Sequence, residues 1–290
     1  MLEKFVKEIN KRGLRLEGVR VLQKGELLEE YRWIPEEPRL IHSCSKAFTS
    51  MAAGFAIAEG LFSPEDKVIE LLELPQYEKT WGGLKIRHLL TMSSGHAEGT
   101  LLFEERGNLT DWMTVFFEKA PEYPPGEHFA YNNGCTYLIS AIIQKLSGEK
   151  LSDYLNTRLF ARMGWEKPYW AECPMGRTQG LSGLHLTTSQ MAEFGQLMLE
   201  GGRDILPDGW IEEAKQKRID TFKEGEEDWS MGYGYYLWRC QHDCWRADGM
   251  LGQFIIVIER LNAVIAISSS EPRMQSILNR VWKYILPKLT

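Results

Sequence analysis

The sequence has few cysteines and no long apolar run. Its 290 residues include five cysteines, an odd number, at the scattered positions Cys44, Cys135, Cys173, Cys240 and Cys244. This spacing does not form a disulfide framework and is typical of free thiols in a reducing compartment. No stretch approaches the roughly 20 apolar residues of a membrane helix, and the N-terminus alternates charged and apolar residues where a signal peptide is continuously apolar. We therefore expect a cytoplasmic chain without a membrane span.

Features typical of nucleic-acid or metal binding are also lacking. The net charge is -6 and the basic residues are scattered, without the basic stripe that nucleic-acid binding requires. This balance favours a small neutral or cationic ligand over DNA. The segment Cys240-Gln241-His242-Asp243-Cys244 supplies only three soft ligands, too few for a closed tetrahedral site, and is more simply a hairpin turn. We expect neither a metal nor a cofactor.

Strand signals occur at both ends of the chain and helical signals lie between them. Residues 14–33 alternate apolar and polar side chains and predict a hairpin, and further strands are expected at 234–239, 244–246, 253–258 and 263–268. Apolar spacing predicts helices at 2–12, 43–59, 86–92, 109–119, 135–146, 151–162, 189–200 and 274–289. The helix at 43–59 is apolar on nearly all sides, so we expect it to be buried, with Gly60 closing it.

This order of elements predicts an α+β fold. One antiparallel sheet assembled from both chain ends would be flanked by helices, and the middle of the chain would be inserted as an all-helical lobe. We assign residues 1–62 and 205–290 to the sheet domain and residues 63–204 to the helical domain. The active site is expected in the cleft between them.

Ser43 and Lys46 lie three residues apart at the start of the apolar helix. Residues at this spacing share a helix face, so the lysine amine can take the proton of the serine hydroxyl. Burial would lower the pKa of Lys46 toward the working range of a base. Unpaired N–H groups at the helix N-terminus would stabilise negative charge that develops near Ser43. The pair therefore predicts a nucleophilic serine.

The same spacing occurs a second time, at Ser147 and Lys150. That copy lies at a helix junction interrupted by glycine, in polar surroundings where a lysine keeps its high pKa. Spacing alone is therefore weak evidence. The six histidines offer no alternative machinery, because His42 is misplaced to share the helix face of Ser43 and the chain contains no Gly-x-Ser-x-Gly elbow.

The flanks of Ser43, Ile41-His42-Ser43-Cys44-Ser45-Lys46-Ala47-Phe48-Thr49-Ser50, resemble the nucleophile segment of the serine beta-lactamase and penicillin-binding-protein superfamily. Similar segments follow in family order at 87–95, at 125–134 with a Tyr-x-Asn motif, and at 183–192. The resemblance covers most of residues 40–270. The sequence resembles the class C beta-lactamase-like branch of this superfamily, which includes esterases, D-alanyl carboxypeptidases and 6-aminohexanoate-oligomer hydrolases. The resemblance implies a beta-lactamase/transpeptidase-like fold.

The resemblance implies roles for both residues of the Tyr-x-Asn motif. Tyr131 would be driven toward phenolate beside a lysinium and would shuttle the proton of the nucleophile to the leaving group. The alternative is a buried ring with a satisfied hydroxyl. Asn133 would bind a substrate amide or carbonyl and help to orient Lys46.

The third family motif, Lys-Thr-Gly or His-x-Gly, is replaced here by Ala247-Asp248-Gly249. Gly249 fits a backbone that must approach a substrate closely, and the N–H of Met250 would join that of Ser43 in an oxyanion hole. In the family a cation at the first position helps to hold a substrate carboxylate, so Ala247 lowers the expectation of beta-lactamase or carboxypeptidase activity. Asp248 would either favour a cationic amine on the substrate or be a surface acid.

These residues predict a serine hydrolase that forms an acyl-serine intermediate on a small ester, amide or short peptide. An esterase or amidase leads within that class, ahead of a D-alanyl-D-alanine carboxypeptidase or a weak beta-lactamase. The rival class is a noncatalytic ligand-binding or regulatory protein that kept the cleft. Ala247 favours this rival, whereas the presence of Ser43, Lys46 and Tyr131 opposes it.

Overall fold

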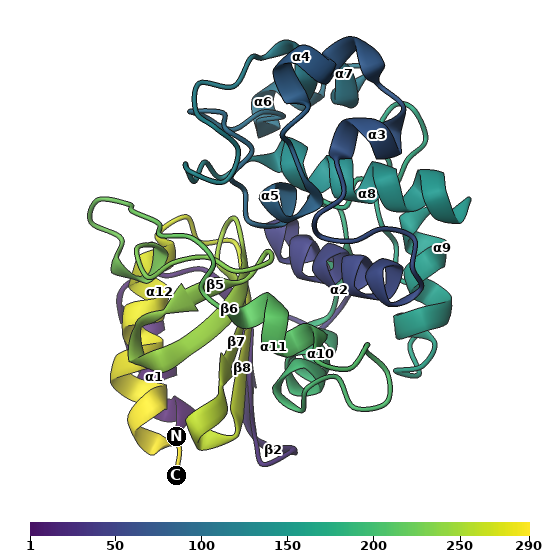
Figure 1. Cartoon of the computed structure of the whole chain (residues 1–290). Coiled ribbons are helices and arrows are strands. Elements are labelled where there is room, and N and C mark those ends of the chain that lie inside the picture. The colour runs from purple at the N-terminus through teal and green to yellow at the C-terminus, as the bar shows by residue number, and fades with distance from the viewer.

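The core of the molecule is a single antiparallel sheet. The computed structural model describes all 290 residues and shows six strands in the order β2-β1-β8-β7-β6-β5, with every neighbouring pair antiparallel. The N-terminal strand β1 (Leu16–Gln23) lies between β2 (Glu26–Arg32) and the C-terminal strand β8 (Ala263–Ser269). The two ends of the chain therefore build one sheet (Figure 1), which confirms the predicted α+β fold.

The remaining strands form a meander from β5 (Trp238–Cys240) through β6 (Cys244–Gly249) to β7 (Gln253–Ile258). β5 is shorter than the strand predicted at 234–239. Tyr236 takes a left-handed φ of 63°, and the N–H of Gly234 donates to the carbonyl of Leu237 at 2.8 Å. These residues therefore turn the chain before the strand begins.

Helices cover both faces of the sheet (Figure 1). α1 (Leu2–Lys11) packs beside α12 (Met274–Arg280), whose path continues through the turns Val281–Ile285 and Leu286–Lys288. On the other side, α10 (Thr188–Leu199) lies on β8, β7 and β1, while α11 (Trp210–Lys215) contacts α2 (Ser45–Ala58). β7 and β8 are buried along their whole length, as expected for strands that are covered twice. None of the helices combines the length and the apolar character needed to cross a membrane.

The middle of the chain is mainly helical and gathers above one end of the sheet (Figure 1). Its helices are α3 (Val68–Leu72), α4 (Glu78–Trp81), α5 (Ile86–Leu90), α6 (Phe103–Arg106), α7 (Trp112–Glu118), α8 (Asn133–Ser147) and α9 (Leu151–Leu155), followed by the turn Asn156–Phe160. α10 lies within the range assigned to the helical domain, yet it packs on the sheet. The division at 63–204 stays a prediction.

A second, very short sheet lies next to the Ser43 segment: β3 (Arg39–Leu40) pairs with β4 (His185–Leu186). Two residues are too few to show a strand period, so the sequence pattern did not predict either strand. The N–H of Ile41 extends this pairing by donating to the carbonyl of Leu184 at 3.0 Å. The chain is therefore held on both sides as it enters the Ser43 turn.

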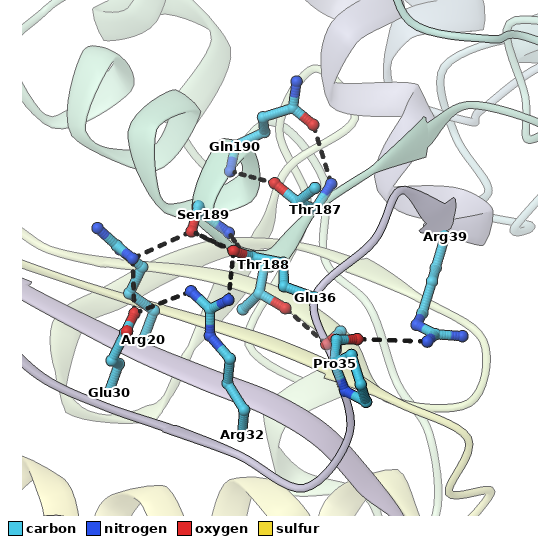
Figure 2. A network of polar contacts seen from close by, with 11 residues as sticks. Arg20, Glu30, Arg32, Pro35, Glu36, Arg39, Thr187, Thr188, Ser189 and Gln190 are labelled. Carbon is cyan, nitrogen blue, oxygen red and sulfur yellow. Dashed lines mark hydrogen bonds and ion pairs between the residues drawn. The ribbon is translucent and has the colours of Figure 1, made fainter.

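A charged network anchors the loop that leads into β3 (Figure 2). Arg32 Nη1 lies 2.6 Å from Glu36 Oε2, and the Glu36 carboxylate accepts from both the N–H and the Oγ of Ser189 at 2.9 Å. Arg20 donates to Ser189 Oγ at 3.0 Å and to Glu30 at 2.6 Å. These contacts tie the sheet, the loop and the start of α10 together directly ahead of Ser43.

Gly195 sets how closely α10 lies on the sheet. A Cβ at this position would lie 2.5 Å from Val264 Cγ1 and 2.9 Å from Ile255 Cγ2. We expect Gly195→Ala to lower the free energy of unfolding by about 1–3 kcal/mol, the usual cost of overpacking, measured by urea denaturation. Gly83→Ala is the control, because a Cβ there meets no atom within 4 Å. Equal stability of the two variants would contradict the packing argument.

Candidate active site

A cavity of ≈ 780 Å³ lies between the sheet and the helical part of the chain. Ser43 opens onto it together with His42. Its walls come from segments far apart in the sequence, and they include Phe103, Arg106, Phe129, Tyr131, Asn133, Leu181, Phe222, Trp229, Trp238, Asp248, Met250 and Arg273. Aromatic rings therefore share this cavity with charged groups.

Ser43 lies just before the helix that the sequence predicts to begin there. It occupies the 3₁₀ turn His42–Cys44, and α2 starts at Ser45. His42 has a left-handed φ of 48°, which a continuous α-helix does not tolerate. Strained residues of this kind concentrate at functional sites. The turn leaves Ser43 partly exposed while the following helix is buried.

Lys46 is buried beside Ser43, with only 1% of its surface exposed. Its Nζ lies 2.9 Å from Ser43 Oγ and donates to the carbonyl oxygen of Leu181 at 2.7 Å. Burial, and next the positive charge of Arg106, lowers the pKa of Lys46 to about 7. Removing an ammonium from water disfavours its charged form. A large fraction of Lys46 is therefore a neutral amine at neutral pH, directly against the serine hydroxyl.

Tyr131 lies close to both Lys46 and Ser43. Lys46 Nζ is 5.0 Å from the centroid of the Tyr131 ring, and the ring stacks on Trp238 at 5.8 Å. Burial, and next the nearby Asp248, raises the pKa of Tyr131, while a hydrogen bond with Ser43 acts in the opposite sense. The phenol therefore keeps its proton. The expected phenolate is not the form that this environment favours.

Asn133 lines the cavity, but its side chain does not orient Lys46. Its Nδ2 donates to the carbonyl of Leu101 at 3.0 Å, and the second partner of Lys46 is the Leu181 carbonyl. A backbone carbonyl carries no residue-type signal, so sequence reasoning missed Leu181. It also missed Asn132, whose Oδ1 accepts from the N–H of Gly134 at 2.8 Å and caps α8. An asparagine directly before a helix is a recognisable capping signal.

The end of β6 approaches the Ser43 turn very closely. A Cβ on Gly249 would lie 2.3 Å from the carbonyl oxygen of Ile41 and 3.1 Å from the amide nitrogens of Ser43 and Cys44. Glycine is therefore required for contact with the turn itself, whereas the sequence predicted contact with a substrate. Ser43 and Met250, the residue after Gly249, both line the cavity beside this contact.

The strand residues before Gly249 differ in their access to the cavity. Ala247 and Gly249 lie outside its wall, whereas Asp248 is part of it. Asp248 is nevertheless buried, with Arg246 Nη2 2.9 Å and Arg246 Nε 3.1 Å from its Oδ2. The expectation that it might be a surface acid is wrong. Alternation along a strand puts residues 246 and 248 on one face, so this pairing was visible in the sequence.

The second Ser-x-x-Lys copy and the cysteine-containing segment 240–244 do not form comparable sites. Lys150 Nζ lies 2.6 Å from Glu172 Oε1 and is about half exposed, so the second Ser-x-x-Lys copy is a solvent-exposed arrangement. All five cysteines are free. No group of three or more His, Cys, Asp or Glu side chains is placed to hold a metal ion.

A six-stranded antiparallel sheet, an inserted helical region and a pair formed by a serine just before α2 and a lysine in its first turn define a hydrolase of the serine beta-lactamase and penicillin-binding-protein superfamily. The family model described as Beta-lactamase matches residues 3–286. The chain belongs to the beta-lactamase family.

Individual relatives share less than a third of their aligned residues with this chain. A protein of Escherichia coli K12 named Beta-lactamase is 29% identical over 119 residues, which are 41% of this chain and 31% of that protein. The match thus spans about a third of the curated relative. A solved structure from Bacillus anthracis, assigned as a 6-aminohexanoate-dimer hydrolase, has a TM-score of 0.80 at 22% identity and covers 98% of this chain and 82% of its own. The octameric penicillin-binding protein homologue from Pyrococcus abyssi has a TM-score of 0.73 at 20% identity, covering 97% and 76%.

The burial of Lys46 has a consequence for stability. Its pKa falls from 10.5 to about 7 on folding, so between these pH values the unfolded chain binds a proton that the folded chain does not. The folded state therefore gains stability as the pH rises through this window. We expect the free energy of unfolding of the wild-type protein to rise relative to that of Lys46→Met by up to about 1.4 kcal/mol per pH unit, measured by urea denaturation inside the window.

Lys150→Met is the matched control for this measurement, because Lys150 is exposed and no such slope is expected from its removal. If the difference between wild type and Lys46→Met stayed constant across the window, Lys46 would have an ordinary pKa.

Proposed function

We propose that this protein is a serine hydrolase that cleaves an ester or amide bond of a small substrate through an acyl intermediate on Ser43. The observation that carries the proposal is the 2.9 Å contact between Lys46 Nζ and Ser43 Oγ at the edge of the cavity. The lowered pKa of Lys46 supports its role as the base. The serine hydrolase machinery of the beta-lactamase family agrees with this assignment.

In the first half of the reaction, the neutral Lys46 amine accepts the proton of Ser43 as Oγ bonds to the carbonyl carbon of the substrate. The carbonyl electron pair moves to its oxygen, which the N–H groups of Ser43 and Met250 stabilise. The bond to the leaving group then breaks. Its proton comes from the Lys46 ammonium through the Tyr131 hydroxyl, which the raised pKa of Tyr131 keeps in the protonated form.

In the second half, water attacks the acyl carbon and gives a proton to Lys46. The second tetrahedral intermediate collapses, the bond to Ser43 Oγ breaks, and the serine regains its proton from Lys46. No residue changes its net protonation over the cycle. Asn133 faces the cavity where a substrate amide or carbonyl could be bound.

We place a simple ester or amide ahead of a beta-lactam or a D-alanyl peptide because of β6, the strand on which the family holds the carboxylate of those two substrates. The first position of the strand motif is Ala247, which is buried and lies outside the cavity wall. The cation next to it, Arg246, is fully buried and already paired with Asp248. This strand therefore offers no free cation for a substrate carboxylate. The fold shared with a protein assigned as a 6-aminohexanoate-dimer hydrolase is compatible with this preference.

A covalent label tests the nucleophile. We expect a fluorophosphonate probe to modify Ser43, located by peptide mass spectrometry, and Ser43→Ala to lose both the label and the hydrolysis of p-nitrophenyl butyrate. Ser147→Ala serves as the control, because Ser147 belongs to the solvent-exposed copy of the motif and should change neither result. Labelling of another serine with Ser43 unmodified would contradict the proposal. Binding of the ester without turnover would favour the noncatalytic alternative.

The pH dependence of hydrolysis tests the base. Because Lys46 must be deprotonated and its pKa is about 7, we expect kcat/KM to rise with pH and to level off above that value. Lys46→Arg should lower kcat/KM by at least about a hundredfold, since a guanidinium stays protonated at any accessible pH. A rate that does not change across the pKa of Lys46 would mean that another group acts as the base.

A further inference from the structure

Arg106 is an unpaired cation in the wall of the cavity. It ends the short helix α6, and its side chain lines the same cavity as Ser43. Its Nε is buried without any hydrogen-bond partner. A buried donor that lacks an acceptor is costly and is rare in folded proteins. The guanidinium lies 5.3 Å from the ring of Phe103, which flanks it on the same helix.

The other charged groups around the cavity already have partners. Lys223 Nζ lies 2.8 Å from Glu226, and Arg273 Nε lies 2.6 Å from Glu271. Asp248 is bound by Arg246, and Lys46 is hydrogen-bonded to Ser43 and to the Leu181 carbonyl. Arg106 makes no ion pair within 4 Å, although the carboxylate of the exposed Glu104, two residues before it, acts on its charge from a greater distance.

The position of Arg106 places its charge near the nucleophile. After burial, Arg106 is the largest influence that lowers the pKa of both His42 and Lys46. Arg106, His42 and Ser43 line the same cavity. A substrate that reaches Ser43 through this cavity therefore passes a wall that carries the Arg106 side chain.

We propose that Arg106 is the specificity-determining residue of this site and that it binds a carboxylate on the substrate, within reach of the bond that Ser43 attacks. This inference rests on the proposed function and names its substrate class: anionic esters or amides. A planar guanidinium binds a carboxylate through two parallel hydrogen bonds, and the Arg106 side chain lies in the wall of the cavity. The net charge of -6 had favoured neutral or cationic ligands, but that charge belongs to the whole chain, whereas Arg106 places a cation without an ion-pair partner in the cavity itself.

The carboxylate would be held from the helical side of the cavity. The corresponding cation of the strand motif is absent, because position 247 is alanine and Arg246 is committed to Asp248. Asp248 also brings a carboxylate to the β6 wall, which disfavours a substrate carboxylate beside it. We therefore expect the substrate carboxylate to bind on the α6 side of the cavity.

Paired substrates measure this preference. Mono-p-nitrophenyl adipate carries a carboxylate on the acyl chain, and its methyl ester is the neutral counterpart. 3-Carboxy-4-nitrophenyl butyrate and p-nitrophenyl butyrate form a second pair with the carboxylate on the leaving group. We expect the wild-type protein to prefer the anionic member of at least one pair by about tenfold or more in kcat/KM, corrected for the rate with Ser43→Ala.

Arg106→Met should remove most of the preference for the anionic substrate. Arg106→Lys should keep part of it, because lysine retains the positive charge but lacks the paired N–H donors of the guanidinium. The control is Arg162→Met, since Arg162 is exposed, pairs with Asp204 and lies outside the cavity; its preference should equal that of the wild type. An anion-to-neutral ratio that is the same in wild type and in Arg106→Met for both pairs would overturn the inference.

A binding measurement separates this inference from the proposed function. In calorimetric titrations of the Ser43→Ala protein, phenylacetate should bind at least about tenfold more tightly than phenylacetamide, and the additional Arg106→Met change should abolish that difference. If no ester is hydrolysed but this difference is present and depends on Arg106, the proposed function fails and the anion site stands. If esters are hydrolysed at Ser43 and phenylacetate affinity does not depend on Arg106, the hydrolase stands and the anion site fails.

Discussion

A lysine amine held in the interior of the molecule is the constraint on which the rest of the site depends. Lys46 has almost no exposed surface, and a buried ammonium without compensation is strongly unfavourable. The protein meets this constraint with two oxygen partners, Ser43 Oγ and the Leu181 carbonyl, and by a lowered pKa that lets the amine shed its charge. The burial that destabilises the charged form of Lys46 also lowers its pKa, which supports the proposed role of Lys46 as a base.

Several segments that are far apart in the sequence hold Lys46 and its surroundings in place. α2 is apolar around its circumference and is buried along most of its length, so the amine that it carries is almost completely shielded from solvent. The Leu181 carbonyl comes from the segment before β4, and β4 pairs with β3 directly ahead of the Ser43 turn. The network of Arg20, Arg32, Glu36 and Ser189 holds that region against the sheet (Figure 2). The geometry at Ser43 therefore depends on contacts spread over much of the chain.

The sheet contributes to the site through proximity of its backbone. Because Gly249 lacks a side chain, the end of β6 can lie against the carbonyl of Ile41 and the amide of Ser43. Any larger residue would push β6 away and separate the amides of Ser43 and Met250. The Arg246–Asp248 pair holds the same strand directly before Gly249, and the Arg246 guanidinium lies over the ring of Trp229 at 4.6 Å. One buried ion pair and one glycine thus position the backbone groups of the site.

Much of the fold and the centre of the site could be predicted from the sequence. The hairpin of β1 and β2, the C-terminal strands and the long buried helix have clear periodicity, so their existence and type were predicted well. The boundaries of the elements were predicted less well. Helix α2 begins at Ser45, after the left-handed His42. Strand β5 begins at Trp238, later than predicted, because Tyr236 also has a left-handed backbone. Left-handed conformations at histidine and tyrosine have no compositional signal.

The sequence by itself determined which residues are the candidates for catalysis, because a serine, a lysine and a tyrosine in family motifs are matters of residue type and spacing. It also contained the alternation that pairs Arg246 with Asp248. Only the tertiary structure decided that Leu181 holds Lys46, that Gly249 touches the Ser43 turn, and that Arg106 points into the cavity without a partner. The physical reason is that these features arise from backbone groups, close approaches and missing contacts between distant segments, which leave no trace in local sequence.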